Sequence, residues 1–387
     1  MTRIAIVGGG IGGLVAGIAL RRAGTDVTIY ERAPAFGEVG AGISMSPNAV
    51  LGLDSLGLGA GLRALANQPL SQDQYHAHTG ELLLSIDRRG TEARYGAPYL
   101  QLHRADLMAM LIRAFGPDGC RMGRDLVGLD SRNDGVSLAF ADGSTVEADA
   151  VVAADGLRSV VRDALFPSPP PVFSGHVAYR GLIPAERAPT RASQPLNINH
   201  LATGRNIVSY PVRQGSLINI VALHKADGWV EEGWAVKASK ADLRARYADF
   251  APYVQDLLTA LPEAHLFRWG LFVREPLTRW RMGRTVLLGD AAHPMLPYMG
   301  QGASCTIEDG VVLGRALTEC ASLDKALATY EATRLPRAAH LQRESNDGGN
   351  RLQAIDPDTF GKAAAVKNED ALDIFAYDPA TVALTRG

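Results

Sequence analysis

The sequence has few cysteines and no long apolar run, and each absence excludes a class of protein. Cys120, Cys305 and Cys320 are too few and too scattered for a disulfide framework or a C-x-x-C redox pair, and we interpret all three as structural. No uninterrupted apolar stretch approaches the roughly 18–20 residues of a membrane-spanning helix. The N-terminus leads directly into a predicted strand, without the layout of a secretory signal. We therefore expect a cytoplasmic protein with no membrane association.

An excess of charge of one sign is also missing. The chain has 39 Lys and Arg residues against 41 Asp and Glu residues, without long runs of like charge. Because nucleic-acid-binding proteins usually cluster basic residues, we expect no nucleic-acid partner. His76 and His78 invite a metal site, but no second group of ligands accompanies them, and we expect no metal. With 387 residues, 47% of them hydrophobic, the chain can form about two or three domains around a sizeable core.

A glycine-rich loop directly follows the first apolar strand. Residues 3–7 form that strand, and Gly8, Gly10 and Gly13 then form a G-x-G-x-x-G pattern that leads into a predicted helix. In a dinucleotide cradle the first glycine allows a tight turn, the second lets the backbone approach a pyrophosphate, and the third lets the helix pack on the strand. The N-terminus of the helix then faces the anion. The pattern predicts a dinucleotide site at the start of the chain.

An acidic residue supports this prediction. The second strand, residues 26–30, ends at Glu31, where a carboxylate would accept hydrogen bonds from a ribose, and Arg32 follows near the adenosine end. A glycine cluster alone often marks an ordinary turn. Because strand, loop, helix and acidic residue occur together in register, we favour the dinucleotide site over that alternative.

The remaining chain mixes predicted strands and helices. Apolar and polar residues alternate between 70 and 99, which predicts strands of a second sheet, and further strands of a substrate-side sheet, interrupted by polar loops, are predicted between 175 and 224. A meander of three strands with a turn at Asp142-Gly143 precedes a buried strand at 148–153. Helices are predicted at 103–111, from Lys240 onward, and at 302–343.

This order predicts an α/β fold with a Rossmann-like nucleotide-binding domain, an inserted and mainly antiparallel β-sheet domain, and a C-terminal helical segment. The nucleotide-binding domain is expected to be discontinuous. Its predicted parts are residues 1–70, 100–170 and 280–345, the sheet domain is predicted at 71–99 and 171–279, and a helical tail is predicted at 346–387.

Two further motifs follow strands. A strand at 151–153 leads into Asp155-Gly156 and a predicted helix. Another strand, 285–288, leads into Gly289-Asp290 and Pro294, and the turn Gly300-Gln301-Gly302 comes shortly afterwards. With the first glycine loop, these motifs resemble, in their order and separations, those of the single-component flavoprotein aromatic hydroxylases.

This family includes the para-hydroxybenzoate and salicylate hydroxylases, and the resemblance extends from the first strand to at least Arg334. The segment Tyr210-Pro211-Val212, the turn at Gly300 and the tail at 373–378 resemble most the branch of salicylate, 3-hydroxybenzoate and 6-hydroxynicotinate hydroxylases. The resemblance implies an FAD-binding domain and a substrate-binding sheet domain. A homodimer is common in this family.

FAD is the cofactor that the resemblance implies. The residues implied in its binding are Gly8, Gly10, Gly13 and Glu31 at the ADP half, Arg32 beside the adenosine, Arg104 at the pyrophosphate and flavin side, Asp155 in a motif serving both FAD and NAD(P)H, Gly289 and Asp290 at the ribityl chain and pyrophosphate, and Pro294, Gly300, Gln301 and Gly302 against the isoalloxazine. The plain alternative for Asp155 and Asp290 is a helix cap. Backbone N–H groups after Gly302 would stabilise negative charge on the reduced flavin.

The resemblance also implies the reaction. NADH or NADPH reduces FAD, O2 adds to form a flavin C4a-hydroperoxide, and one oxygen passes to a small phenolic or heteroaromatic acid, with or without decarboxylation. The chain shows one complete dinucleotide fingerprint and no C-x-x-C pair, which argues against a disulfide reductase and favours transient binding of NAD(P)H. The protein must supply a dry pocket, orient the ring and help to deprotonate a phenol.

Candidates for contact with the substrate come from two segments. Tyr210, in a predicted strand, and Tyr298, in the loop before Gly300, would hydrogen-bond a phenol or carboxylate; the alternative is that each only packs. Asn206 stands where many members of the branch have a histidine as the presumed base, and an amide cannot take a proton at neutral pH. The base is then His200, His224 or Tyr210, or the substrate arrives ionised or activated by an amino group. Ser44, Met45 and Arg180 are further candidates for the border of the pocket.

Two other functions are weighed against the hydroxylase. One is an FAD-dependent oxidoreductase of another class that acts on a larger or non-phenolic substrate, such as a dehydrogenase or a halogenase, but the segment Trp229–Trp234 does not match the W-x-W-x-I-P of halogenases. The other is a redox-sensing FAD-binding protein. That alternative would leave the flavin-edge turn and the tyrosine-bearing sheet without a purpose.

Overall fold

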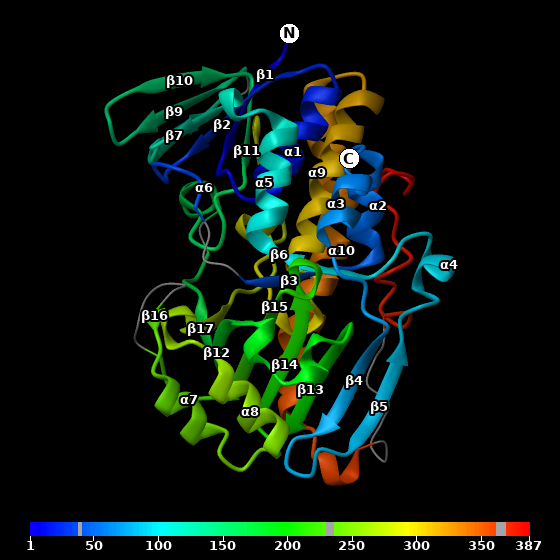
Figure 1. Cartoon of the computed structure of the whole chain (residues 1–387). Coiled ribbons are helices and arrows are strands. Elements are labelled where there is room, and N and C mark those ends of the chain that lie inside the picture. The colour runs from blue at the N-terminus through cyan, green and yellow to red at the C-terminus, as the bar shows by residue number, and fades with distance from the viewer. Residues whose placement is uncertain (38–40, 133, 167, 230–235, 361–368) are drawn as a thin grey trace.

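The computed structural model describes residues 1–37, 41–132, 134–166, 168–229, 236–360 and 369–387. A parallel sheet with helices on its faces occupies one half of the molecule, and a larger sheet occupies the other (Figure 1). Trp234 of the halogenase comparison lies outside the described residues. Among the described residues, none of the helices is long and apolar enough to cross a membrane.

The first sheet has six strands in the order β18-β19-β11-β1-β2-β7, and all neighbours are parallel except β18 and β19. Its strands are β1 (Arg3–Val7), β2 (Asp26–Glu31), β7 (Cys120–Met122), β11 (Ala150–Ala153), β18 (Arg281–Met282) and β19 (Thr285–Leu287). The central strands β1 and β11 are continuous apolar runs, as expected for strands buried on both faces. Helices α1 (Ile11–Arg22), α5 (Arg104–Phe115) and α9 (Gly302–Glu319) pack beside this sheet (Figure 1).

A three-stranded antiparallel sheet confirms the predicted meander. It contains β8 (Leu126–Ser131), β9 (Val136–Phe140) and β10 (Thr145–Ala148). Gly143, in the turn between β9 and β10, has φ of 81°, which glycine adopts without strain. Other helices and strands in this half of the molecule and at its border are β3 (Gly42–Met45), α2 (Pro47–Ser55), α3 (Gly59–Leu65), α4 (Thr91–Tyr95), β6 (Leu100–His103) and α6 (Val160–Leu165).

The second large sheet has eight strands in the order β16-β17-β12-β15-β14-β13-β4-β5. They are β4 (Ser71–His76), β5 (Leu82–Asp87), β12 (Val172–Pro184), β13 (Leu196–Ala202), β14 (Arg205–Val212), β15 (Leu217–Lys225), β16 (Val236–Lys237) and β17 (Phe267–Val273). All pairs are antiparallel except β4 with β13. The predicted inserted and mainly antiparallel sheet is confirmed.

The two faces of this sheet have different neighbours. Ile207, Ile218 and Ile220 pack with buried residues of α7 (Lys240–Arg246) and α8 (Pro252–Ala260), and we call this side the helix-covered face. Successive side chains in a strand point to opposite sides. The alternate residues, among them Leu223 and Trp269, pack with Leu296 and Tyr298 of the loop that precedes α9. We call this side, which carries Asn206 and Tyr210, the inner face.

The C-terminal region corrects one prediction. Helix α10 spans Leu323–Ala354, and the described residues beyond it form a 3₁₀ turn at Pro357–Thr359 followed by turns without a further helix. Among the described residues of the expected helical tail at 346–387, only the first part is therefore helical. Proline disfavours helical geometry in the residue before it, so Asp356-Pro357 ends the helix, and the described residues 369–387 are held by tertiary contacts instead.

Candidate active site

The glycine loop has the geometry that a dinucleotide cradle needs. Gly8 has φ of 103°, and a Cβ placed on it would lie 2.3 Å from the carbonyl oxygen of Ala154. A Cβ on Gly13 would lie 2.0 Å from the carbonyl oxygen of Gly8. Gly10 differs, because a Cβ there would have no atom within 4 Å. Gly8 and Gly13 are thus fixed by protein packing, whereas Gly10 borders open space.

That open space belongs to a cavity of about 300 Å³ between the glycine loop and α5. The residues that line it are Gly9, Gly10, Glu31, Ala33, Ala35, Phe36, Gly37, Ala105, Met108, Ala109 and Ile112. The carboxylate of Glu31 accepts hydrogen bonds from the N–H of Gly9 at 2.7 Å and of Ala33 at 2.9 Å. A carboxylate has room for further donors, so Glu31 can shape the loop and also accept from a ribose. Arg32 is exposed and is not among the lining residues.

Asp155 acts as a structural cap in this arrangement. Its Oδ1 accepts from the hydroxyl of Ser159 at 2.5 Å and its Oδ2 accepts from the N–H of Val161 at 3.2 Å. Ser159 in turn caps α6 by accepting from the N–H of Arg162. Burial raises the pKa of Asp155, and these hydrogen bonds act in the opposite direction. The contacts favour the cap for Asp155, and its part in binding FAD or NAD(P)H stays a prediction.

Asp290 and Arg104 come together from distant segments of the chain. Asp290 lies in a 3₁₀ turn at Gly289–Ala291 directly after β19, and its side chain is exposed. The protein around it nevertheless raises the pKa of its carboxyl, while the positive charges of His293 and Arg104 lower it. Arg104 begins α5. An accessible carboxylate within the electrostatic influence of an arginine at a helix start suits the polar middle of a dinucleotide, and the FAD contacts of both residues stay predictions.

The turn before α9 presents uncapped backbone. Gly300 has φ of 63°, Gln301 is the N-cap without a side-chain cap, and Gly302 is the first helical residue. The first N–H groups of a helix have no partner within it, and the helix dipole places positive potential there. Gln301 is buried and its amide group bonds to Ser46 and Asn48 near the start of α2. Gln301 therefore fixes the turn, and Gly302 leads the free N–H groups toward the predicted flavin edge.

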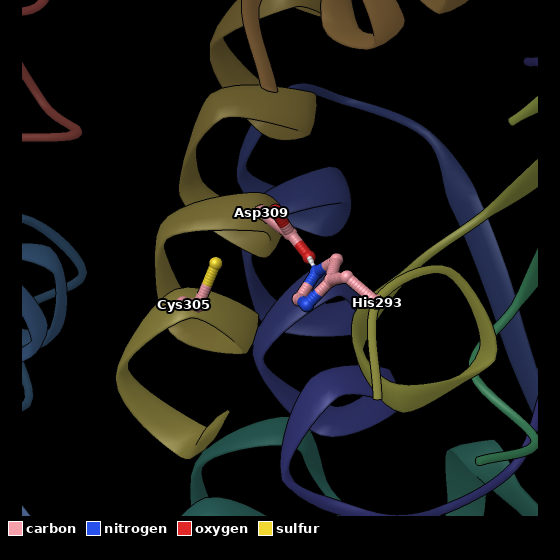
Figure 2. Close-up of side chains that lie close together, drawn as sticks. All are labelled: His293, Cys305 and Asp309. Carbon is pink, nitrogen blue, oxygen red and sulfur yellow. Dashed lines mark hydrogen bonds and ion pairs between the residues drawn. The ribbon is translucent and has the colours of Figure 1, made fainter. Parts of the chain in front are cut away.

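His293 of the loop after β19 lies close to Cys305 and Asp309 of α9 (Figure 2). These residue types at this separation can ligate a metal, but the Nε of Arg334 lies 2.8 Å from Asp309 Oδ1, and its Nη2 lies 3.2 Å from Cys305 Sγ. His293 Nε2 is 2.6 Å from Asp309 Oδ2, which also accepts from the N–H of Gly289. The positive charges already satisfy Asp309, so the cluster is an ion-pair network and we propose no metal for it.

The charges in this network stabilise one another. Burial by itself lowers the pKa of His293, but Cys305 and Asp309 outweigh burial and raise that pKa well above its ordinary value. Burial raises the pKa of Asp309, and the charges of His293 and Arg334 reverse the effect and lower it. Arg334 also pairs with Glu308 at 2.6 Å. These ion pairs hold the loop that carries Asp290 and Pro294 against α9 and α10. Pro294 is buried in this loop.

Tyr210 lies on the inner face, beside β3. A Cβ on Gly42 would lie 2.7 Å from the hydroxyl of Tyr210, and the N–H of Gly42 donates to Asn219 Oδ1 at 2.7 Å. Burial and the nearby phenol of Tyr99 raise the pKa of Tyr210, while a hydrogen bond with Ser44 lowers it. At neutral pH Tyr210 is therefore a neutral phenol that can donate a hydrogen bond.

Asn206 is part of a row of carboxamides that crosses three strands. Its Nδ2 donates to Asn199 Oδ1 at 3.0 Å, and Asn199 Nδ2 donates to Gln74 Oε1 at 3.0 Å. Asn206 is 2% exposed. The row fixes the orientation of the Asn206 amide, which can orient a substrate but cannot act as a base.

His200 and His224, two of the predicted bases, lie on the helix-covered face. His200 is paired with Ile207, stacks on Tyr75 and has its pKa lowered to about 4 by burial and Arg191. His224 stacks on Tyr179, and burial with nearby positive charges lowers its pKa to about 3. Because alternate residues of a strand point to opposite faces of the sheet, these positions argue against either histidine as the base, and the identity of the base stays a prediction.

The structure adds two residues that the sequence analysis missed. Tyr99 directly precedes β6, and its phenol is near enough to raise the pKa of Tyr210. His176 is buried in β12, and its ring lies 5.6 Å from that of Tyr298. Burial and Lys225 lower the pKa of His176, so its imidazole is neutral at neutral pH. Counting alternate residues along β12 from the inner-face residue Ala178 would have found His176; no local pattern marks Tyr99.

Comparison with known proteins agrees with this geometry. Residues 1–345 match the family described as FAD binding domain. The chain is 36% identical over 379 residues to a 3-amino-4-hydroxybenzoate 2-monooxygenase of Streptomyces platensis, covering 97% of this chain and 95% of that protein. It is 35% identical over 352 residues to a 6-hydroxynicotinate 3-monooxygenase of Pseudomonas fluorescens, covering 89% of this chain and 90% of that protein.

A solved structure shows the same likeness in three dimensions. The substrate complex of a salicylate hydroxylase superposes with a TM-score of 0.83 at 28% identity, over 98% of this chain and 96% of the other. The predicted relation to the salicylate, 3-hydroxybenzoate and 6-hydroxynicotinate hydroxylases is confirmed. The chain belongs to the FAD-binding-domain family and is a flavin-dependent aromatic hydroxylase.

Proposed function

We propose that this enzyme uses NAD(P)H and O2 to hydroxylate a small phenolic or heteroaromatic acid, with or without decarboxylation. The observation that carries the proposal is the meeting of two sites. The glycine loop, Asp290 and the uncapped start of α9 form a cofactor site, and Tyr210 of the inner face lies next to β3 at its border. The similar proteins are named for 3-amino-4-hydroxybenzoate, 6-hydroxynicotinate and salicylate, which are all small ring acids.

The residues present fit FAD. Gly10 faces a cavity that a side chain would enter, Glu31 lines the same cavity, and the carboxylate of Asp290 is accessible beside Arg104. Bound FAD would supply the redox chemistry of the reaction, in which NAD(P)H is the reductant, O2 is the oxidant and one oxygen atom goes to the ring. The N–H groups that follow Gly302 then stabilise negative charge at the flavin edge.

On the substrate side, residues of the inner face bind and orient the aromatic acid. Tyr210 donates a hydrogen bond from its phenol to a substrate oxygen, and the fixed amide of Asn206 holds a second polar group. Apolar residues of the inner face, such as Leu223 and Trp269, exclude water. Asn206 cannot take a proton from the substrate. The substrate ring is therefore activated by ionisation of the substrate or by an amino substituent, or a residue other than Asn206, His200 and His224 takes the proton.

Several finer predictions complete the proposal. Five residues either contact FAD directly or fix the backbone of the loops that contact it. They are Gly8, Gly13, Asp155, Pro294 and Gln301. Tyr298 lies over the site from the loop before α9. We also propose the division into an FAD-binding domain, a substrate-binding sheet domain and a C-terminal segment, together with a cytoplasmic homodimer that binds neither nucleic acid nor membrane.

The test is oxidation of NADH and of NADPH in air by the purified yellow protein, with a panel of hydroxybenzoates, aminohydroxybenzoates and hydroxypyridine acids. We expect one group of acids to stimulate oxidation and to yield a product one oxygen heavier, or one in which hydroxyl replaces carboxylate. The nicotinamide cofactor that supports the faster reaction identifies the donor. Slow oxidation that no aromatic acid changes, with flavin bound, would contradict the proposal and favour an oxidoreductase that acts on a larger substrate.

A further inference from the structure

The described C-terminal residues 369–378, which we call the tail segment, fold back beside α4 and α10 (Figure 1). Ile374 and Phe375 are buried. Arg337 of α10 donates from Nη1 to the carbonyl of Asp373 at 2.8 Å and from Nη2 to that of Ile374 at 3.2 Å. These contacts fix the backbone of the tail segment within the folded core.

Acidic residues fix the other side of the tail segment. Glu369 forms an ion pair with the buried Arg88. Asp370 pairs with Arg94 at 2.6 Å and accepts from the hydroxyl of Tyr95. Both partners of Asp370 belong to α4, which lies between β5 and β6 in the chain. The tail segment therefore bridges α10 and the connection that leads to β6.

Phe375 reaches Tyr99 across this bridge. The two ring centroids are 5.9 Å apart, and the Arg88 guanidinium lies 5.5 Å from the Tyr99 ring and 5.3 Å from the Phe375 ring. Tyr99 is itself buried. Aromatic and cation–π contacts of this kind restrict the orientation of a ring. The position of Tyr99 therefore depends on the tail segment.

Tyr99 in turn touches the substrate side. Ser44 of β3 lies opposite Gln101 of β6, so Ser44 is the diagonal neighbour of Tyr99 on the same face of this ladder. Gly42 lies on that same face, and a Cβ on it would lie 2.7 Å from the hydroxyl of Tyr210. The Ser44 side chain lowers the pKa of both phenols. The two phenols are near enough that Tyr99 raises the pKa of Tyr210. A continuous set of contacts thus runs from Phe375 through Tyr99 and Ser44 to Tyr210.

We propose that Tyr99 is a positioning residue of the substrate site, and that Phe375 of the tail segment holds Tyr99 so that the hydroxyls of Ser44 and Tyr210 keep one arrangement toward the substrate. This inference rests on the proposed function, in which Tyr210 binds the substrate. The C-terminal segment then controls how much of the NAD(P)H consumed is used for hydroxylation, although it lies far from every cofactor motif in the sequence.

The experiment compares Tyr99→Phe, Phe375→Ala and the double variant as FAD-saturated holoenzymes. We measure kcat and KM for the aromatic acid, and the product and hydrogen peroxide formed per NAD(P)H. Loss of one aromatic contact or hydrogen bond corresponds to a rise in KM of about three- to tenfold. We expect that rise in both single variants, with more peroxide per NAD(P)H. The double variant should be no worse than Tyr99→Phe, because both changes act on the same hydroxyl.

Two further variants separate positioning from general loosening. Phe375→Leu keeps an apolar side chain and should give an intermediate KM and peroxide yield. Leu372→Ala removes a buried side chain of the same segment that cannot stack on Tyr99, and it should keep the wild-type KM and peroxide yield. Melting temperatures of all variants show whether they are folded at the assay temperature.

Three results would overturn the inference alone. The first is an unchanged yield of product per NAD(P)H in Phe375→Ala and Phe375→Leu, with a lower yield in Tyr210→Phe. The second is a double variant in which the effects of Tyr99→Phe and Phe375→Ala on KM and on peroxide yield add. The third is a peroxide yield in Leu372→Ala as high as that in Phe375→Ala. A wild-type enzyme that hydroxylates no aromatic acid would instead overturn the proposed function and the inference with it.

Discussion

The glycine loop at residues 8–13 and the inner face of the eight-stranded sheet are both parts of the proposed active site, yet different physical constraints specify them. At the loop, neighbouring backbone forbids a side chain at Gly8 and Gly13, so the sequence itself shows the geometry. On the inner face, Asn206 and Tyr210 gain their positions from pairing between strands that are distant in sequence. Single substitutions in the loop should therefore abolish FAD binding or folding, whereas substitutions on the inner face should lower activity only in part.

The largest effect is expected for Gly8→Ala. A Cβ would lie 2.3 Å from the carbonyl oxygen of Ala154, and φ of 103° is a conformation that alanine rarely adopts. This oxygen belongs to the backbone that follows β11, the strand paired with β1, so it cannot move aside easily. We expect a loss of about 2–4 kcal/mol in the free energy of unfolding, with loss of FAD. Urea unfolding and flavin absorbance measure both, and a stable yellow variant would contradict the packing argument.

Gly10→Val separates cofactor binding from folding. Gly10 has φ of −74° and ψ of −173°, which any residue adopts, and no protein atom lies within 4 Å of the added Cβ. The apoprotein should therefore unfold within about 0.5 kcal/mol of the wild type. A branched side chain would occupy the path of a pyrophosphate, so we expect FAD binding to be abolished. Full flavin content in this variant would show that the loop is not the cradle.

His293→Gln tests the ion-pair network that fastens the cofactor loop. The pKa of His293 is raised in the folded protein above its ordinary value of 6.5. Its ion pair therefore stabilises fully below about pH 6.5 and loses this effect as pH rises through the raised pKa. We expect the variant to lose about 1.5–3 kcal/mol at pH 7, the range for a hydrogen bond to a charged group, and less at strongly alkaline pH.

Urea unfolding at several pH values in excess FAD measures this difference. A difference between the two proteins that stays constant from pH 6 to pH 10 would show that His293 is not held as a cation. Tyr330→Phe is a matched control, because it removes a buried hydrogen bond to the carbonyl of Leu287 nearby without removing a positive charge. Its effect on unfolding should be independent of pH below the titration of tyrosine.

Tyr210→Phe should have a smaller and different effect. The variant keeps the buried ring but removes the hydroxyl next to Ser44 and Gly42. Loss of one hydrogen bond to the substrate corresponds to a change of about two- to tenfold in kcat/KM. We expect FAD to stay bound while more NAD(P)H is consumed per product. Unchanged coupling would assign Tyr210 to packing alone.

The difference between the two regions also explains which predictions the sequence allowed. The order of the motifs, the antiparallel sheet and the meander follow from local patterns of glycine, turn residues and hydrophobic alternation, and the structure has them. The assignment of Asp290 and Arg104 to FAD did not follow from any local pattern; it came from the resemblance to known hydroxylases. The structure adds that the charge of Arg104 lowers the pKa of Asp290.

Contacts between distant segments were harder to predict. Tyr99 has no motif around it and gains its place from Phe375 and Ser44, which lie far away in the sequence. Likewise the tail segment contains neither proline nor glycine, yet it forms no helix, and ion pairs with Arg88 and Arg94 hold it in an irregular course. In these places tertiary contacts override local preference.

The choice of base shows how one register decides function. His200 and Asn206 are both in strands of the same sheet, but His200 pairs with Ile207, and this places it on the face that α7 and α8 cover. A catalytic base would contribute about a hundredfold or more to the rate. Because His200 points away from the substrate side, His200→Asn should change kcat/KM by less than about twofold, the smallest effect of this series. The same assay on Asn206→Ala, which lies on the inner face, should show a clear loss. A hundredfold loss in His200→Asn with FAD still bound would show that the strand pairs in a different register and would return His200 to the active site.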